Sequence, residues 1–275
     1  MIMKENFLLV GAGAIGVAIA RRIGKDKKIF IADNRIENSE AVAKTLREIG
    51  YDCVACVCDI SSRDSIKKML DQVGEISMFA NSAGVTPDRA PKELILKINL
   101  YGTAVLLEEV GKAIKTNGTG ITITSQAERE LPALTPEQDH QLGATATDDL
   151  LKLDLLQPEN IRDSLHAYQL AKRCNLRRVL SEAVKWGHKK ARINAISPGL
   201  LVTPASYAVF NGDQKKSYDE TFSKIPSGRP GMVDEVACTA EFLLNPANPF
   251  ITGADILVDG GTTASYFYGP LRPEK

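Results

Sequence analysis

Short apolar runs alternate with longer stretches of helical periodicity along most of the chain. The apolar runs, typical of buried strands, lie at 7–10, 28–32, 52–57, 76–80, 120–124, 191–197 and 255–258. Apolar residues recur at helical spacing at 14–23, 37–49, 62–72, 92–115, 163–187 and 233–244. Because strands that are apolar on both faces need helices on both sides, this order predicts a doubly wound parallel sheet of about seven strands. We therefore expect an α/β fold of Rossmann type in a single domain over residues 1–275.

Two long segments interrupt the alternation. Residues 126–162 separate a predicted strand from a predicted helix, and residues 199–232 form a loop containing Pro and Gly after the strand at 191–197. Loops of this length in a compact domain usually carry function. We expect the 199–232 loop to cover a bound substrate, and the apolar residues at 150–156 to form a short helix.

Composition and charge narrow the class of protein. The chain has 34 basic and 34 acidic residues, so it gives no electrostatic reason to expect a nucleic acid or an anionic membrane as partner. The first six residues lack a signal-peptide pattern, and no apolar run reaches the ~18 residues that span a bilayer. These features predict a cytoplasmic protein. Three of the five cysteines lie in the strand at 52–57 or directly after it, and with no second Cys or His cluster we expect no metal site.

A glycine-rich turn follows the first predicted strand. Residues Gly11–Gly16 read G-x-G-x-x-G and open the first predicted helix, where backbone N–H groups can approach a pyrophosphate. Asp33 ends the second predicted strand, where an acid binds the adenosine ribose hydroxyls of a dinucleotide. Its carboxylate also repels a 2′-phosphate, which favours NAD over NADP. Arg35, two residues on, is a cation able to offset that repulsion.

Tyr168 and Lys172 lie four residues apart in a predicted helix, and so share one face of it. A lysine ammonium near a phenol favours the phenolate and lowers the pKa of the tyrosine. Such a tyrosine can give or take the proton of a substrate hydroxyl. By itself the spacing is a weak signal, because any helix with a Tyr and a Lys can show it, and the alternative is an ordinary pair on the protein surface.

Further motifs occur in a fixed order around this pair. They are Asp59 after the third strand, Asn81-Ser82-Ala83-Gly84 after the fourth, Asn99 in the helix at 92–115, Ser125 at the end of the fifth strand, Pro198-Gly199 followed by Thr203, and the C-terminal segments Ile251-Thr252-Gly253 and Val258-Asp259-Gly260-Gly261. With these motifs the chain resembles the short-chain dehydrogenase/reductase family, classical type, along nearly its whole length. The resemblance implies an oxidoreductase that interconverts an alcohol and a ketone with a nicotinamide cofactor.

The resemblance also implies a role for each site residue. Ser125 would hydrogen-bond the substrate oxygen, and Tyr168 would be the general acid–base. Lys172 would lower the pKa of that tyrosine and hold the nicotinamide ribose, while Asn99 would fix a water that relays protons. The implied cofactor-binding residues are Gly11, Gly13, Ile15, Gly16, Asp33, Asp59, Ile60, Asn81, Ala83, Gly84, Tyr168, Lys172, Pro198, Gly199, Leu201 and Thr203.

The chain departs from the family pattern in two places. Val10 stands where the family has threonine before the glycine turn, Ala14 replaces a usual glycine, and the turn is one residue shorter. The gap from Ser125 to Tyr168 is longer than the common spacing, which makes residues 126–162 an insertion. A comparable insertion occurs in the bacterial 3α-hydroxysteroid dehydrogenase/carbonyl reductase branch, so a bulky, steroid-like alcohol or ketone is the substrate that this resemblance suggests.

Three further expectations follow from the resemblance. We expect a homo-oligomer, either a dimer or a tetramer, although the insertion lies beside the helix that usually forms the contact. An idle NAD-binding sensor or scaffold is the alternative to an enzyme, but Tyr168 and Lys172 are both present. A sugar-nucleotide epimerase of the extended branch is a third interpretation, and the chain after Gly261 is short for its substrate domain.

Overall fold

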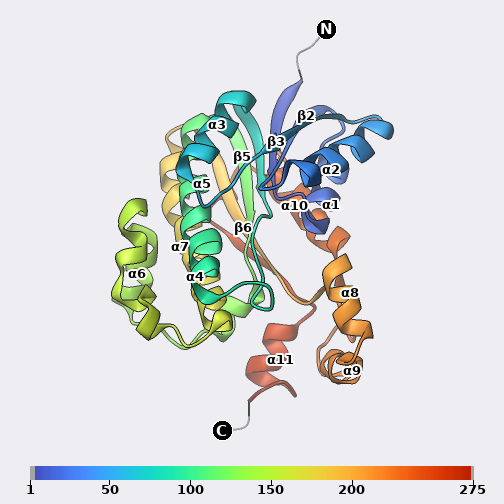
Figure 1. Cartoon of the computed structure of the whole chain (residues 1–275), viewed down its shortest axis with the longest axis vertical. Coiled ribbons are helices and arrows are strands. Elements are labelled where there is room, and N and C mark those ends of the chain that lie inside the picture. Colours follow the sequence, from blue (N-terminus) through green and yellow to red (C-terminus); the bar gives the residue numbers. More distant parts are fainter. Residues whose placement is uncertain (1–3, 274–275) are drawn as a thin grey trace.

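A computed structural model describes residues 4–273 and contains a parallel sheet of seven strands in the order β3-β2-β1-β4-β5-β6-β9. The strands are β1 (Glu5–Val10), β2 (Lys27–Asp33), β3 (Asp52–Val57), β4 (Ile76–Asn81), β5 (Ile114–Ile123), β6 (Arg192–Pro198) and β9 (Asp255–Val258). The helices beside them are α1 (Ala14–Ile23), α2 (Ile36–Glu48), α3 (Arg63–Val73), α4 (Lys92–Ile95), α5 (Thr103–Ala113), α7 (Ser164–Gly187) and α10 (Val233–Leu244). Helices cover both faces (Figure 1), which confirms the predicted doubly wound fold in one domain.

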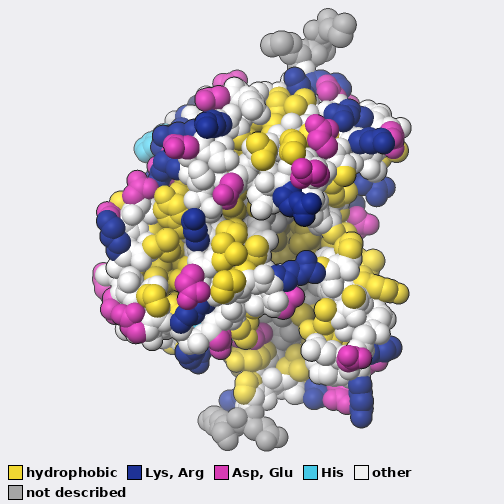
Figure 2. All heavy atoms as spheres, viewed as in Figure 1, with side chains coloured by type: hydrophobic (Ala, Val, Ile, Leu, Met, Phe, Trp, Pro, Cys, Tyr) yellow, Lys and Arg dark blue, Asp and Glu magenta, His cyan; other side chains and the backbone are white. Residues whose placement is uncertain are grey.

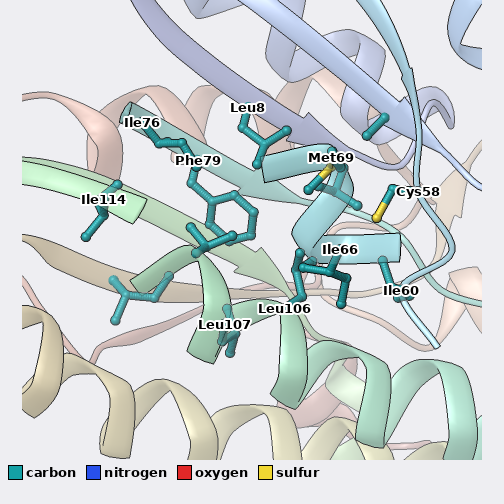
Figure 3. Close-up of a cluster of buried hydrophobic side chains, with 14 of the residues drawn as sticks. Leu8, Cys58, Ile60, Ile66, Met69, Ile76, Phe79, Leu106, Leu107 and Ile114 are labelled. Carbon is teal, nitrogen blue, oxygen red and sulfur yellow. The ribbon is translucent and has the colours of Figure 1, made fainter. Parts of the chain in front are cut away.

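Alternate residues of the central strands point to opposite faces of the sheet. Leu8 and Phe79 pack against α3, α5 and α7, whereas Phe7 and Leu9 pack against α1, α2 and α10. Figure 3 shows Phe79 of β4 among apolar side chains of its own strand, the neighbouring strand β1, α3 and α5, namely Ile76, Leu8, Ile66, Leu106 and Leu107. Apolar side chains on both sides of the sheet are the physical reason that these strands read as continuous hydrophobic runs.

The direction of winding reverses at β1, which pairs with both β2 and β4. The chain moves outward from β1 to β3, returns to β4, and then proceeds through β5 and β6 to β9 at the other edge. In such sheets a crevice opens beyond the carboxyl ends of the two strands at the reversal. The glycine turn after β1 and the motif after β4 therefore meet at one place.

The predicted helix at 92–115 is wrong in its detail. It consists of α4, a π-helical segment at Leu96–Gly102 and α5, and it ends at Ala113 because β5 begins at Ile114. A register shift between Ile76 and Met78 on the partner strand accommodates the early start of β5. Polar, turn-forming residues at 115–118 hid this start in the sequence.

The segment at 126–162 is ordered by its own apolar residues. It contains a 3₁₀ turn at Gln126–Glu130, helix α6 (Pro136–Ala144) and three further 3₁₀ turns, so the single short helix predicted at 150–156 is wrong. Leu142, Leu150 and Leu155 are buried against residues of α4, the π-helical segment and α7. Helix α6 lies along the outer side of α7 (Figure 1).

The segment at 199–232 is not the irregular loop that was predicted. It contains β7 (Leu201–Val202), α8 (Pro204–Asn211), α9 (Lys215–Ser223) and β8 (Gly231–Met232). Thr203 and Ser206 form a reciprocal cap at the start of α8, and an aromatic cluster that includes Phe210 and Phe222 joins the two helices.

The C-terminal helix α11 (Thr262–Tyr268) carries the aromatic residues of the tail, and it lies below the sheet with α8 and α9 (Figure 1). It packs against the 3₁₀ turn that follows Ser125. Among the helices of residues 4–273, none combines the length and apolar character needed to cross a bilayer.

Candidate active site

The turn between β1 and α1 is closed against the end of β4 and open on its other side. Gly11 has a φ of +99°, and a Cβ there would lie 2.6 Å from the backbone nitrogen of Ala83. A Cβ at Gly16 would overlap the carbonyl oxygen of Gly11. A Cβ at Gly13 would meet nothing within 4 Å. Packing therefore requires the first and last glycine, whereas the middle one leaves a free backbone surface that a ligand can approach.

Asp33 at the end of β2 is tied to this turn. One carboxylate oxygen accepts a hydrogen bond from the backbone nitrogen of Ala12 at 3.0 Å. The other accepts hydrogen bonds from the side chain of Asn38 at 2.9 Å and the backbone nitrogen of Arg35 at 3.2 Å. The Arg35 side chain is exposed and lies 3.8 Å from Glu37.

A cavity of about 380 Å³ lies beside the glycine turn, at the reversal of the sheet. Seven of the sequence-predicted cofactor residues line it, namely Gly11, Gly13, Asp33, Asp59, Ile60, Ala83 and Gly84. Figure 2 shows a hollow near the middle of this view of the molecule, with hydrophobic and basic side chains beside it. A glycine-walled hollow that also presents a carboxylate has the donors and acceptors to hold the phosphates and a ribose of a dinucleotide. Tyr168 and Lys172, predicted for the nicotinamide end, do not line it.

Other predicted cofactor residues do not line this cavity. Asn81 is buried and supports it, since its amide donates to Thr122 at 3.1 Å and accepts from the backbone nitrogen of Ala83 at 3.1 Å. Ile15 and Gly16 lie in the first turn of α1. Leu201 borders a separate, smaller hollow with Gly260, and Pro198, Gly199 and Thr203 line neither of the two.

Several lining residues escaped the sequence analysis. They are Asn34, Asn38, Cys58, Ser82, Val85, Arg89 and Ile98, with Val10 and Ala12 from the glycine turn. Ser82, read only as part of a motif, donates to the carbonyl oxygen of Gly11 at 3.0 Å. Arg89 places a cation beside the cavity, 3.6 Å from Asp88. The only feature of the sequence that could have indicated Arg89 as a cavity residue is its position shortly after the carboxyl end of β4.

Lys172 is buried inside the protein rather than on its surface. Its side chain comes from α7, is 6% exposed, and donates from Nζ to the carbonyl oxygen of Ile123 at 3.1 Å. Nζ also lies 5.3 Å from the centre of the Tyr168 ring. The interpretation of this pair as surface residues is therefore wrong. Burial lowers the pKa of Lys172 to about 8, because the charged form loses its hydration.

Tyr168 is half-buried beside Lys172, close to the end of β5. Burial raises the pKa of Tyr168, and a hydrogen bond from Ser125 acts in the opposite direction. The depression of this pKa by Lys172 that the resemblance implied is absent here, since desolvation outweighs the other effects. Ser125 in turn accepts a hydrogen bond from the backbone nitrogen of Ala127 at 3.2 Å.

Asn99 holds Val85 at the border of the cavity. Its side chain accepts from the backbone nitrogen of Val85 at 2.9 Å and donates to the carbonyl oxygen of Val85 at 2.8 Å. Val85 lines the cavity and packs on the same apolar cluster as Tyr168. Both ends of the Asn99 amide are thus engaged with Val85, and its backbone lies in the π-helical segment where the hydrogen-bond ladder shifts.

Comparison with known proteins agrees with this arrangement. Residues 5–135 match the family model described as short chain dehydrogenase, and residues 146–263 match the one described as Enoyl-(Acyl carrier protein) reductase. The short-chain dehydrogenase/reductase bsc3 of Alternaria brassicicola is 34% identical, over 95% of this chain and 96% of that protein. D-threitol dehydrogenase of Mycolicibacterium smegmatis is 30% identical, over 94% of this chain and 93% of that protein.

Solved structures show the same fold. A short-chain type dehydrogenase/reductase from Mycobacterium ulcerans superposes with a TM-score of 0.76 at 21% identity, over 95% of this chain and 90% of that one. Levodione reductase gives a TM-score of 0.75 at 22% identity, over 97% of this chain and 100% of that one.

Burial of Lys172 predicts a pH-dependent stability. Its pKa falls from 10.5 to about 8 on folding, so between these values the unfolded chain binds more protons at this site than the folded chain. The free energy of unfolding contributed by this group therefore rises with pH across that window, by about 3 kcal/mol. Relative to a Lys172→Met variant, the wild type should gain that stability between pH 8 and 10.5 in urea unfolding.

A Lys44→Met variant, at an exposed position of α2, is the matched control for the loss of a lysine. If the difference in free energy of unfolding between the wild type and Lys172→Met did not change between pH 8 and 10.5, the ammonium of Lys172 would not be desolvated.

Proposed function

The chain belongs to the short-chain dehydrogenase/reductase family, and we propose that it transfers a hydride between a nicotinamide cofactor and a secondary alcohol or ketone, with Tyr168 as the proton donor and acceptor. Oxidoreduction of an alcohol or ketone group is the activity that the relatives support. The observation that carries the assignment is the grouping of the buried Lys172 with the half-buried Tyr168 and Ser125 at the end of β5, beside an apolar cluster on which both Tyr168 and the cavity residue Val85 pack.

The chain offers the cofactor a specific set of groups. The open backbone at Gly13 and the N-terminus of α1 would hold the diphosphate, with Arg89 as a nearby cation. Asp33 would accept hydrogen bonds from the adenosine ribose, and Asp59 with Ile60 would border the adenine. When bound, the nicotinamide supplies the hydride donor or acceptor.

A proton must move together with the hydride, and the buried groups are placed to move it. Ser125 would hold the substrate oxygen near the Tyr168 hydroxyl. In alcohol oxidation the phenolate of Tyr168 accepts the hydroxyl proton, and in ketone reduction the phenol donates it. Its raised pKa keeps Tyr168 protonated in the structure as it stands, which suits donation to a ketone. A cationic Lys172 would favour the phenolate that oxidation needs.

We propose NAD as the preferred cofactor, with NADP disfavoured. Asp33 directs its carboxylate to the glycine turn, and a 2′-phosphate would meet that negative charge. The cation expected to offset the repulsion, Arg35, points toward Glu37 and does not line the cavity. Asn38, which holds the other carboxylate oxygen, carries no charge.

We propose an apolar, bulky alcohol or ketone as substrate. Leu131 and Leu134 follow the turn after Ser125, and both pack on the apolar cluster that contains Tyr168. Aromatic residues of α11 lie near the same turn, because α11 packs on it. The competing substrate class is a small polyol, since one relative is a D-threitol dehydrogenase.

A homo-oligomer remains a prediction, and the structure limits where its contact can lie. Helix α6 packs along α7 and covers part of that helix. Elsewhere on α7, Leu180 and Val184 remain 46% and 71% exposed, and Phe250 before β9 is 100% exposed. These residues belong to the exposed apolar surface that is available for a second copy.

Replacing Tyr168 with Phe removes one hydroxyl and separates an enzyme from an idle binding protein. We expect kcat for any alcohol or ketone to fall by about 10²- to 10⁴-fold, because the transition state loses its proton donor. Cofactor affinity, measured by fluorescence titration, should stay unchanged. The assay follows absorbance of the reduced nicotinamide with a substrate panel from steroid alcohols to polyols.

Tyr51→Phe is the matched control, since Tyr51 bonds the carbonyl oxygen of Arg21 away from the cavity. A Tyr168→Phe protein with full turnover would refute the role of this hydroxyl. A wild type that binds NAD but turns over nothing in the panel would favour the sensor. Turnover of polyols alone would overturn the apolar substrate.

The Asp33→Asn variant tests the cofactor preference. It keeps the shape of the side chain but removes the charge, so the ratio of Kd for NADP to Kd for NAD should fall by about 10-fold or more. Asp64→Asn, at an exposed position in α3, should leave the ratio unchanged. Isothermal titration with both cofactors gives the ratio directly. Tighter binding of NADP than of NAD by the wild type would contradict the proposal.

A further inference from the structure

Buried and half-buried charges connect the 126–162 segment to the catalytic end of β5, and the proposed proton transfer uses none of them. The connection begins in α6, where Asp139 accepts from Nε of Arg173 at 2.8 Å and lies 2.5 Å from Arg177. Both arginines belong to α7, and Arg173 directly follows Lys172. Helix α6 is thus fixed by charge to the helix that carries Tyr168 and Lys172.

Glu128 is the centre of the connection. Its side chain is 1% exposed, and its carboxylate lies 3.0 Å from Arg173 and 3.2 Å from Nε of Arg129. Glu128 belongs to the 3₁₀ turn that starts after Ser125, and its backbone nitrogen donates to the carbonyl oxygen of Ser125 at 3.4 Å. With the bond from Ala127 to the Ser125 hydroxyl, this turn holds Ser125 at both its oxygens.

The connection continues from the same turn to the ends of two strands. Arg129 donates to Asp255 at 2.6 Å, and Asp255 accepts from the hydroxyl of Ser197 at 2.7 Å. The Ser197 hydroxyl lies 2.7 Å from that of Thr124, and both residues are buried. Thr124 directly precedes Ser125, and Ser197 directly precedes Pro198. The connected groups therefore contact Thr124, which precedes Ser125, as well as the turn that follows Ser125.

We propose that Glu128 is a positioning residue for Ser125, and that it couples helix α6 to the catalytic site through Arg173 and Asp139. The proposal rests on the proposed function, in which Ser125 holds the substrate oxygen. One oxygen of the Glu128 carboxylate accepts a charge-assisted hydrogen bond from Arg173, whereas the other lies near Arg129 without a hydrogen bond. The bond to Arg173 gives the carboxylate a defined orientation and so fixes the turn that places the serine. Misplacement of a catalytic group by about 1 Å costs up to about 10²-fold in rate.

The ion pairs around Glu128 allow this residue to be replaced without loss of the fold. When Glu128 is replaced by Gln, Arg173 keeps Asp139 and Arg129 keeps Asp255 as partners. No guanidinium is left buried without a carboxylate, so the large penalty for an unpaired buried charge does not arise. What the variant loses is the orientation of the turn.

The test compares Glu128→Gln and Asp139→Asn with an ion pair in the same segment that lies outside the connection. Asp149 pairs with Lys152 at 2.7 Å, and both side chains are more than half exposed, so Asp149→Asn is the matched control. We expect kcat to fall by about 10-fold in Glu128→Gln and in the same direction in Asp139→Asn, with KM for the cofactor unchanged. Amide hydrogen exchange, read by mass spectrometry, should rise at residues 124–131 in both variants and not in the control.

Two results would overturn the coupling. One is a Glu128→Gln protein whose kcat stays within about two-fold of wild type while Tyr168→Phe is inactive. The other is exchange that rises in α6 of Asp139→Asn but not at 124–131. A wild type without turnover would instead sink the proposed function, and the exchange measurement would still decide whether α6 and the turn are coupled.

Discussion

The structure depends on a lysine ammonium being held inside the protein next to a phenol. Lys172 donates to a backbone carbonyl at the end of β5, and no carboxylate forms an ion pair with it within residues 4–273. A buried ammonium without a counter-ion is costly, which is why its pKa falls to about 8. Such a group gains most from binding near polar or negatively charged ligand atoms. The fold places it one helical turn from Tyr168 and beside the strand end that carries Ser125.

The cavity and this buried group lie along the same edge of the sheet. Glycines at the β1–α1 turn allow close contact with the end of β4, and Asp33 ties β2 to the same turn. Asn99 fixes Val85, which touches both the cavity and the cluster around Tyr168. The carboxyl ends of successive strands therefore bring together side chains that are distant in sequence, as expected where a doubly wound sheet reverses.

Local patterns in the sequence were enough to predict the sheet, the glycine turn, the position of Asp33 at the end of β2, and the position of Tyr168 and Lys172 one turn apart on a helix, because each depends on spacing within one or two elements. Interactions between distant segments were not predictable in this way. Pro204 and the glycines of 199–232 suggested a loop, whereas the cap at Thr203 starts a helix there. The roles of Arg89 and Glu128 depend on which groups face them across the fold. The pKa of Tyr168 depends on how deeply the phenol is buried, and its spacing from Lys172 in the sequence gives no information about burial.

Titration of Tyr168 tests the central claim most directly. Selective isotope labelling of tyrosine ring carbons, with Tyr168→Phe to assign the signal, gives the pKa of this phenol by NMR with and without oxidised nicotinamide cofactor. The account expects a pKa above the ordinary value of about 10 in the free protein, and a fall when the cationic nicotinamide binds beside it. An ordinary pKa that the cofactor leaves unchanged would place the phenol in solvent, away from the cofactor, and would contradict the account.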